Sequence, residues 1–343
     1  MGEEKIKMKD IAQLAGVSRS AVSLALNGKK GVSKKTREKI FRVIQENNYK
    51  PLRKRNGGKN HKLSNVRFII INKANKHGLV TDNFRALPFF NDLLNKILKN
   101  INNFGGKVQI ESLDGDNLSK ELSNIKSSDK IYPAVILGTD LTSEEVLEID
   151  RAIPKAVFID TYYPGISADF VTMDNYQGAY LAAKTILAKG YKRIGYIASE
   201  KVMSNFQERR RGFYAALKEM EVELDAKDFY VVSPTRMLPS MDNPLLSIND
   251  LPQAVFCEND YMAIRLIKEL NQQKINVPKD IGVIGFDDIY EGKIITPELT
   301  TIHVPIEQIA DQALHQLQSK VALDDWEPQK CLVSTRLIER SSL

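Results

Sequence analysis

Residues 18–27, SRSAVSLALN, combine a helix-capping serine with side chains that can read DNA bases. Arginine can form two hydrogen bonds to guanine, so Arg19 and the neighbouring Ser20 are the best candidates for base contacts. Leu24 can only touch a thymine methyl group or exclude a base. Contacts to DNA are predicted for six residues of this segment: Ser18, Arg19, Ser20, Ser23, Leu24 and Asn27.

The first 62 residues are strongly basic. They carry 17 Lys and Arg against 5 Asp and Glu, a net charge of +12, whereas the remaining residues carry 32 against 38, a net charge of −6. This asymmetry suggests a polyanionic partner for the basic part alone, although lysine-rich segments are often merely solvated. Phosphate contacts, which position a protein on DNA without reading its sequence, are predicted for Lys9, Lys29, Lys30 and Lys34.

Two short helices across a tight turn must position the base-reading segment. Apolar residues recur on one face of residues 8–15, Gly16 permits a left-handed turn, and Ser18 can cap a second helix. We expect a third helix from Ser33 to about residue 48. The residues expected to face inward are Ile11, Ala12, Leu14, Ala15, Ala21, Val22, Ala25, Leu26, Ile40, Val43 and Ile44. This arrangement is a helix-turn-helix, whose second helix can enter the DNA major groove; the alternative is two packing helices of another small domain.

The run DIAQLAGVSRSAVSLALNG resembles the N-terminal signature of the lactose-repressor (LacI/GalR) family of bacterial transcription regulators. Four later runs, RRRGF, FCENDYMAI, IGVIGFDD and LTTIHVP, resemble that family's effector domain, so the resemblance covers nearly the whole chain. It implies a homodimer that binds a double-stranded DNA operator and responds to a small molecule. The expected fold is an all-α helix-turn-helix head plus an α/β periplasmic-binding-protein-like body of two parallel-sheet lobes.

The segment that follows the head, LRKRNGGKNHKLSN, departs from the family pattern. Family members usually form a short hinge helix here, and its leucine wedges into the minor groove. In this chain the leucine position falls near Gly58, beside Gly57, and paired glycines make a helix costly. We therefore expect a basic tether that touches DNA through Arg53, Lys54 and Arg55, or else a simple linker.

From residue 66 onward, apolar runs typical of buried strands alternate with helical segments. Such alternation predicts parallel sheets covered by helices on both faces. The expected domains are the DNA-binding head at 1–51, the tether at 52–65 and the effector-binding body at 66–343. Within the body, we expect lobe 1 at about 66–161 and 290–320, and lobe 2 at about 162–289 and 321–343.

Polar side chains stand at the ends of the predicted strands of the body, where ligands of open α/β sheets bind. An arginine, carboxylates and an amide that converge on one cleft suit a polyhydroxyl ligand or a flat polar ring. By resemblance, the effector contacts are Asp160, Arg209, Asn259 and Asp287, with Phe89 and Phe90 stacking against the effector. The alternatives are that the acidic and amide side chains only cap loops and helices, and that one of the two phenylalanines belongs to the core.

The remaining features argue against enzymes and secreted proteins. Dinucleotide-binding and P-loop motifs are absent, the four histidines have no metal-ligand spacing, and no catalytic residues or cofactor are predicted. The two cysteines, Cys257 and Cys331, lie in apolar stretches, and the polar N-terminus differs from a signal peptide. We expect a transcription repressor in the cytoplasm, at the nucleoid, controlled by a sugar or sugar derivative. The alternatives are a solute-binding receptor without specific operator binding and a purine- or nucleoside-type effector.

Overall fold

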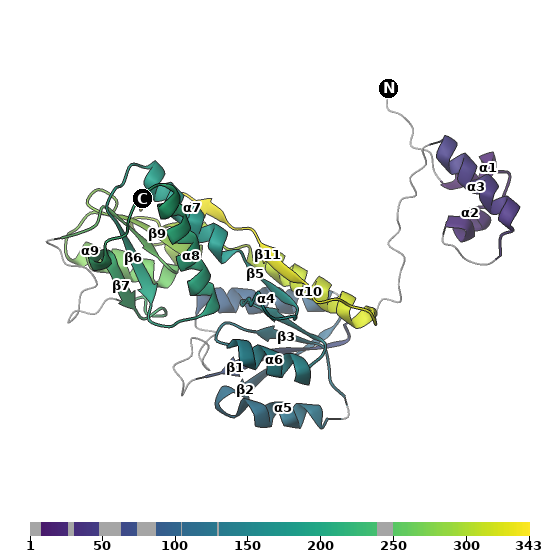
Figure 1. The fold of residues 1–343 in the computed structure, drawn as a ribbon, viewed down its shortest axis with the longest axis horizontal. Helices are drawn as coiled ribbons and strands as arrows, with labels where there is room; N and C mark the ends of the chain where they lie inside the picture. Colours follow the sequence, from purple (N-terminus) through teal and green to yellow (C-terminus); the bar gives the residue numbers. More distant parts are fainter. Residues whose placement is uncertain are drawn as a thin grey trace. The chain divides into compact units, whose positions relative to one another are not determined.

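The computed structural model describes residues 8–26, 31–47, 63–73, 87–103, 105–128, 130–238 and 250–343. The chain divides into two compact units, Met1–Asn60 and His61–Leu343, which are drawn in Figure 1 and described separately below. None of the helices in the described ranges is long and apolar enough to span a membrane.

The described residues of the first unit form three helices: α1 (Met8–Leu14), α2 (Arg19–Leu26) and α3 (Lys34–Glu46). Gly16 has a φ of +61° in the turn between α1 and α2, as predicted, because glycine adopts this conformation without a Cβ clash. The side chain of Ser18 caps α2 by accepting a hydrogen bond from the Ala21 amide (3.1 Å). The described core of this unit consists of Ile11, Ala12, Ala15, Val22, Ala25 and Ile40, with Val43 and Ile44 packed against it.

One apolar residue of the head lies where it was not expected. Leu14 was predicted to face inward, but its side chain is 56% exposed. At 100° per residue, Leu14 lies on nearly the opposite side of α1 from the buried Ala12. The prediction for Leu14 was therefore wrong.

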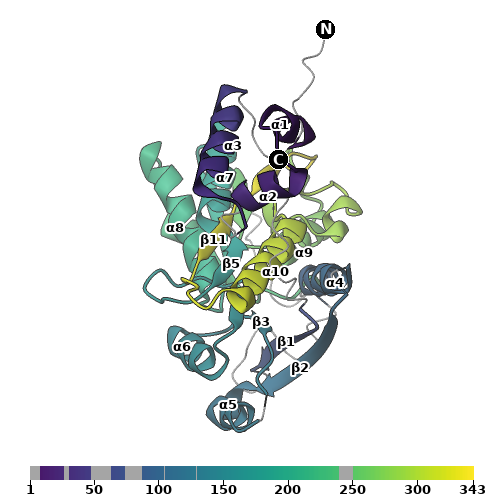
Figure 2. The same cartoon turned by 90° about the vertical axis from the view of Figure 1, so that its right-hand side faces the viewer.

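In the second unit, the part of the chain that the structure describes forms two six-stranded sheets (Figure 1). The first has the order β11-β5-β4-β3-β1-β2, and all of its pairs are parallel. Its strands are β1 (Asn65–Asn72), β2 (Lys107–Asp114), β3 (Ala134–Leu137), β4 (Ala156–Ile159), β5 (Phe170–Met173) and β11 (Lys330–Val333). The helices α4 (Pro88–Asn103), α5 (Leu118–Lys126), α6 (Ser143–Ala152) and α10 (Ile306–Ala322) belong to this lobe, and α10 packs against α4 (Figure 2).

The second sheet has the order β12-β10-β9-β8-β6-β7. Its strands are β6 (Ile194–Ser199), β7 (Phe229–Val232), β8 (Ala254–Cys257), β9 (Gly282–Asp287), β10 (Thr300–His303) and β12 (Arg336–Ile338). Only the β10–β12 pair is antiparallel among its described pairs. The helices α7 (Asn175–Ala188), α8 (Ser204–Glu219) and α9 (Asp260–Gln272) accompany this sheet.

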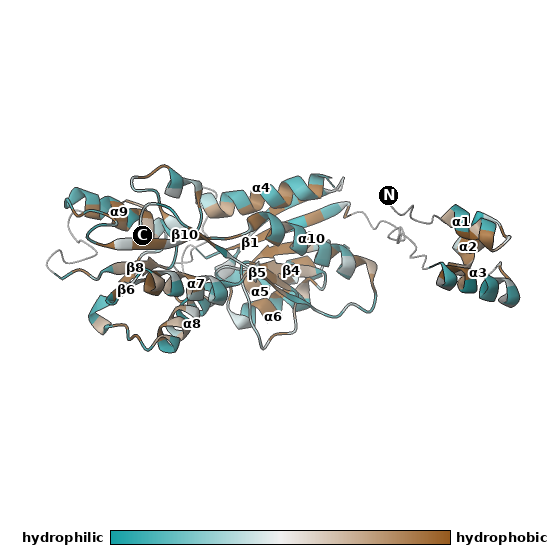
Figure 3. Cartoon of the chain, turned by 90° about the horizontal axis from the view of Figure 1, so that it is seen from above, coloured by the Kyte–Doolittle hydropathy of each residue, from teal (hydrophilic) through white to brown (hydrophobic). Residues whose placement is uncertain are grey.

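Strand β1 illustrates that the sheet to which it belongs is buried on both faces. Six consecutive residues, from Val66 to Ile71, are buried. Phe68 and Ile70 contribute to one hydrophobic cluster, whereas Ile69 and Ile71 contribute to a second one on the opposite face. Alternate residues of a strand point to opposite faces, so consecutive residues are all buried only when both faces of the sheet are covered. The hydropathy colouring of Figure 3 shows this arrangement, with brown strands and teal outer faces on helices such as α4.

The lobe boundaries differ from those predicted. Strands β5 and β11 belong to the first sheet, although they were assigned to lobe 2, and β10 belongs to the second sheet, although it was assigned to lobe 1. The chain therefore crosses between the sheets after β5, after β10 and after β11. Strand pairing decides membership, and these four-residue strands carry no composition change that marks the crossovers.

The crossovers lie at one edge of the two sheets. β11 and β5 are the terminal pair of the first sheet, and β12 and β10 are the terminal pair of the second. The first and third crossovers are tied together, because the Asp174 amide donates to the Val333 carbonyl (2.9 Å). The Gln177 side chain also accepts from the Thr335 amide (3.0 Å) and donates to the Thr335 carbonyl (3.2 Å). This edge is thus a connected junction between the lobes.

Candidate functional site

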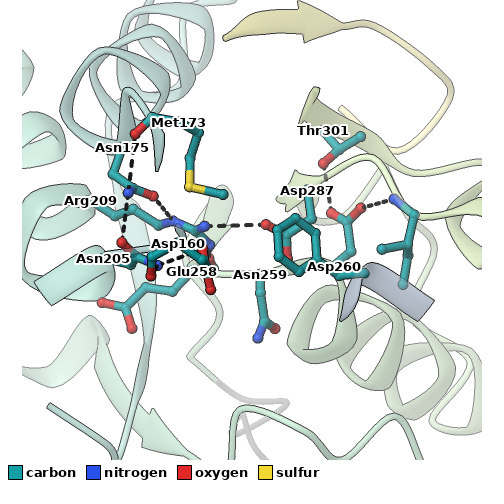
Figure 4. Close-up of polar contacts among 12 residues, drawn as sticks. Asp160, Met173, Asn175, Asn205, Arg209, Glu258, Asn259, Asp260, Asp287 and Thr301 are labelled. Carbon is teal, nitrogen blue, oxygen red and sulfur yellow. Dashed lines mark hydrogen bonds and ion pairs between the residues drawn. The ribbon is translucent and has the colours of Figure 1, made fainter. Parts of the chain in front are cut away.

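Arg209, on α8, is the centre of a buried polar cluster (Figure 4). Its side chain is 4% exposed. The Nε atom donates to Asn175 Oδ1 (2.8 Å), Nη2 donates to Asp287 Oδ1 (3.2 Å), and Nη1 donates to the Glu258 carbonyl. The guanidinium carbon lies 3.7 Å from the ring centroid of Phe286. Of the three consecutive arginines, Arg209 is the one in the cluster, and its contact with an effector stays a prediction.

A continuous chain of hydrogen bonds connects Arg209 to the first lobe. Asn175 Nδ2 donates to Asn205 Oδ1 (3.0 Å), and Asn205 Nδ2 donates to both the backbone oxygen (3.0 Å) and Oδ1 (2.9 Å) of Asp160. Thr139 Oγ1, at the end of β3, donates to the other oxygen of the Asp160 carboxylate. Because Asp160 follows β4 and Asn205 begins α8, this chain joins the two lobes through buried side chains.

Sequence reasoning missed Asn175 and Asn205. Asn205 lies four residues before Arg209, which places both side chains on one face of α8. That spacing was the available signal. Asn175 is the first residue of α7 and carried no comparable signal, because its role depends on a crossover that was not predicted.

The two carboxyl groups of the cluster are difficult to ionise. Burial raises the pKa of Asp287 to about 8; the Arg209 charge opposes this shift, and the nearby Asp260 and Asp160 add to it. Burial also raises the pKa of Asp160 to about 6, against hydrogen bonds from Thr139 and Asn205 and the Arg209 charge. Burial therefore favours the protonated form of both carboxyl groups, more strongly for Asp287 than for Asp160, and a protonated carboxyl group can donate a hydrogen bond.

Backbone geometry at the strand ends is unusual. Asp160, Asp287 and Asp288 have φ values of 56°, 122° and 58°. Non-glycine residues seldom adopt such conformations unless the surrounding contacts hold them there, and they are enriched at binding sites. These positions lie where ligands bind in open α/β sheets.

The structure buries both Phe89 and Phe90, on α4 of the first lobe. Phe89 is 6% exposed and Phe90 is 3% exposed, and their rings form an edge-to-face pair with centroids 5.4 Å apart. The Phe89 amide donates to the Tyr261 hydroxyl (3.1 Å), which links α4 to α9 across the lobes. One of the two rings was expected in the core, whereas the structure buries both. Stacking of either ring against an effector stays a prediction.

Asn259 and Asp260 make structural contacts within the second lobe. The Asn259 side chain caps α9 by accepting from the Met262 amide (3.0 Å), and it donates to the Pro234 carbonyl (2.8 Å). Asp260 accepts from Thr301 Oγ1 (2.6 Å) and the Ile289 amide (3.0 Å). Both ends of the Asn259 amide therefore have protein partners, as in the capping alternative, and its contact with a ligand stays a prediction.

A surface hollow adjoins the polar cluster on the side of Asn175 and Asn205. It lies where β5 crosses into α7, beside the start of α8. Its other lining residues are Tyr162, Thr172, Met173, Asp174, Tyr176, Ser204, Glu208 and Leu332. Asn175 and Asn205, two members of the polar cluster, also line this hollow. Among the residues that the structure describes, no group of His, Cys, Asp and Glu is arranged to hold a metal ion.

Gly212 allows α8 to approach α7 closely. A Cβ atom on Gly212 would lie 2.0 Å from the Tyr176 carbonyl oxygen. We therefore expect Gly212→Ala to separate the two helices and to lower the free energy of unfolding by about 1–3 kcal/mol, the usual cost of overpacking. Urea unfolding would measure this. Gly165→Ala is the control, because no atom lies within 4 Å of a Cβ added there. Equal stability of both variants would show that α7 can shift without cost.

The side chains that were predicted to contact bases lie on α2 in the first unit. Arg19 and Ser20 are exposed, as is Lys9 on α1, whereas Ser23 and Leu24 are partly buried. Leu24 leans towards Gly31, since its Cδ1 would lie 3.3 Å from a Cβ on that residue. Asn27, Lys29, Lys30, Arg53, Lys54 and Arg55 lie outside the described residues, as does the side chain of Lys34.

Comparison with known proteins identifies both parts of the chain. Residues 7–52 match the family described as "Bacterial regulatory proteins, lacI family", and residues 183–343 match "Periplasmic binding protein-like domain". The transcriptional repressor PurR of Mannheimia succiniciproducens is 26% identical over 98% of both chains. The repressor of the same name from Vibrio vulnificus is 28% identical over 92% of this chain and 91% of its own.

Solved structures share the fold. A complex of the transcriptional regulator CelR with cellobiose is 23% identical, with a TM-score of 0.68 over 98% of this chain and 99% of that one. The lac repressor dimer bound to operator and the anti-inducer ONPF is 19% identical, with a TM-score of 0.68 over 99% of both chains. The N-terminal helices, the two-lobed α/β body and the full-length relatives lead to one conclusion: the chain joins a DNA-binding domain of the lacI family, at residues 7–52, to a periplasmic-binding-protein-like domain, at residues 183–343.

Proposed function

We propose that this DNA-binding regulator represses transcription from an operator and is controlled by a small polar effector at the Arg209 cluster. The observation that carries the proposal is the buried chain of side-chain contacts from Asp160 through Asn205 and Asn175 to Arg209 and Asp287. It joins the lobes at the strand ends, so a molecule that bonds to these groups alters the contacts between the lobes. An effector can shift the protein only through different affinities for its two states.

A sugar or sugar derivative is the first candidate for the effector. Carboxyl groups, an amide and a guanidinium offer the donors and acceptors that hydroxyl groups need. The CelR complex, which shares the fold, contains cellobiose. A purine is the second candidate, because the full-length relatives carry the name PurR and a flat ring with polar edges suits the same groups.

A thermal-shift screen tests the effector site. The full-length protein is heated with cellobiose, glucose, glucose 6-phosphate, hypoxanthine or guanine, because a ligand that binds only the native state raises the Tm. We expect one class to raise the Tm of the wild-type protein and of Arg211→Gln, but not that of Arg209→Gln. Arg211 is the matched control, with a side chain 66% exposed. A ligand that stabilises all three proteins equally would place the effector elsewhere.

For the head, we propose that α2 reads the operator in the major groove and that a homodimer places two heads on two half-sites. One head makes too few contacts for tight specific binding, which supports a dimer. The proposed location is the cytoplasm, where the operator lies. Binding to random duplex should weaken steeply with salt through Lys9 and the other lysines.

Leu24 should influence operator choice. We expect Leu24→Arg to change the preferred half-site, because arginine can form two hydrogen bonds to guanine where leucine offers only apolar contact. The change at the affected base pair should be about 1–3 kcal/mol. Selection from a randomised duplex pool would reveal it, with Leu14→Arg as a control, since Leu14 is exposed on α1 outside the reading helix. Identical preference in wild type and Leu24→Arg would show that residue 24 does not face the bases.

A further inference from the structure

Two adjacent arginines of α8, Arg209 and Arg210, donate hydrogen bonds to different groups of the same residue, Glu258. Arg209 Nη1 donates to the backbone carbonyl of Glu258, whereas Arg210 Nε donates to its Oε1 atom (2.6 Å). Arg210 Nη2 also donates to the Ser199 carbonyl at the end of β6 (2.8 Å). The pair thus ties α8 to the ends of β6 and β8, the strands beside the polar cluster.

Glu258 is fully buried but well supplied with donors. Its carboxylate also accepts from the Tyr196 hydroxyl (2.9 Å) and the Ser199 amide (2.6 Å). Burial raises the pKa of Glu258, and the hydrogen bond and charge of Arg210 oppose that shift. Removal of the Arg210 guanidinium would therefore leave a buried carboxyl group that lacks its counter-ion.

The geometry of the two contacts restricts α8. Side chains of consecutive helical residues diverge by about 100°, so contacts from both to one residue resist rotation of the helix about its axis. Arg209 must reach Asn175 and Asp287 from that same turn. A small rotation of α8 would lengthen the Arg209–Asp287 contact, which is already 3.2 Å.

We propose that Arg210 and Glu258 form a positioning pair that holds Arg209 in its place for effector binding. The inference rests on the proposed function of Arg209, but Arg210 itself acts from outside the cluster. Its side chain is 24% exposed and lies 6.0 Å from the ring centroid of Phe229 on the edge strand β7. A purely structural ion pair would affect unfolding without moving Arg209.

A titration of Asp287 separates these two roles and needs no effector. Full-length wild type, Arg210→Gln, Arg210→Lys and Arg211→Gln are labelled with ¹³C in the aspartate carboxyl groups. The Asp287 signal is assigned by its loss in Asp287→Asn. In Arg210→Gln we expect Arg209 to withdraw from Asp287 and the apparent pKa of Asp287 to rise by about half a pH unit or more. Arg211→Gln should match the wild type.

The conservative variant keeps the test decisive if Arg210→Gln fails to fold. Lysine retains the charge but replaces the guanidinium fork with a single ammonium group, so Arg210→Lys should shift the pKa of Asp287 in the same direction by a smaller amount. For an effector found in the screen, Arg210→Gln should weaken binding about tenfold or more, as expected when a binding group is displaced. An unchanged pKa of Asp287 in a folded Arg210 variant would overturn the proposal, even if its Tm falls. A shifted pKa without any effector binding would instead support the pair and argue against the proposed function.

Discussion

Arg209→Gln is expected to abolish the effector response while the protein still binds duplex DNA. The guanidinium supplies charge-assisted hydrogen bonds that glutamine cannot replace, and losing them should weaken effector binding about 100-fold or more. DNA binding should persist, because the proposed DNA contacts belong to the head. Effector titration by calorimetry and operator binding in its presence measure the two effects.

The same variant should lose stability in a pH-dependent way. Removing one partner of a buried ion pair typically costs about 3–5 kcal/mol. Protonation of Asp287 reduces this cost, because a neutral carboxyl group needs no counter-ion, and burial raises its pKa to about 8. The stability loss should therefore be smaller at pH 6 than at pH 9. A loss of equal size at both values, or an intact effector response in Arg209→Gln, would contradict the assignment of Arg209.

Asp287→Asn is expected to stabilise the protein at alkaline pH. The pKa of this carboxyl group is about 8 in the folded protein, against a usual value of 3.8, so folding is accompanied by proton uptake between these values. The unfolded state binds fewer protons in this range, so the wild type loses stability as pH rises from about 4 to 8. Asparagine carries no such penalty. The Tm of the variant should exceed that of the wild type at pH 9, and the difference should shrink towards pH 5.

Asp250 provides a control of opposite sign. Hydrogen bonds from Arg193 and Lys227 lower its pKa to about 2. Its contribution is therefore present above the unfolded pKa and lost as pH falls towards 2. Asp250→Asn should lower the Tm at neutral and alkaline pH. If Asp287→Asn changed the Tm by the same amount at pH 5 and pH 9, Asp287 would not hold its proton in the folded wild type.

Much of the fold could be predicted because local sequence and final structure agree. The run VRFIIIN predicts a strand buried on both faces, and β1 is one. Helix α6 spans Ser143–Ala152, and a capping box between Thr142 and Glu145, whose residue types the sequence displays, holds its start. In both cases the deciding interactions involve residues close in sequence or a burial pattern that the sequence displays directly.

The failures depend on contacts between distant residues. Strand β5 has four residues, FVTM, and it becomes a strand by pairing with β4 and β11, the latter 160 residues away. Asn175 shares the cluster with Asn205 only because the crossover after β5 brings α7 beside α8. Arg210 and Glu258 are likewise joined by tertiary packing. The residues that carry the polar chemistry of the site could be predicted from the sequence, whereas the residues that hold them in position could not.

The junction at the β5–β11 edge has a mechanical consequence. All three covalent connections between the lobes lie at the edge formed by β11 and β5 in one sheet and by β12 and β10 in the other. Hydrogen bonds of Asp174 and Gln177 join two of these connections. Such an edge acts as a hinge, so the lobes can rotate about it but can hardly slide past one another. The displacement of a strand during this rotation grows with its distance from the hinge. The strands farthest from it, β2 and β7, should therefore move most. Spin labels on those two strands would report the swing with the greatest leverage.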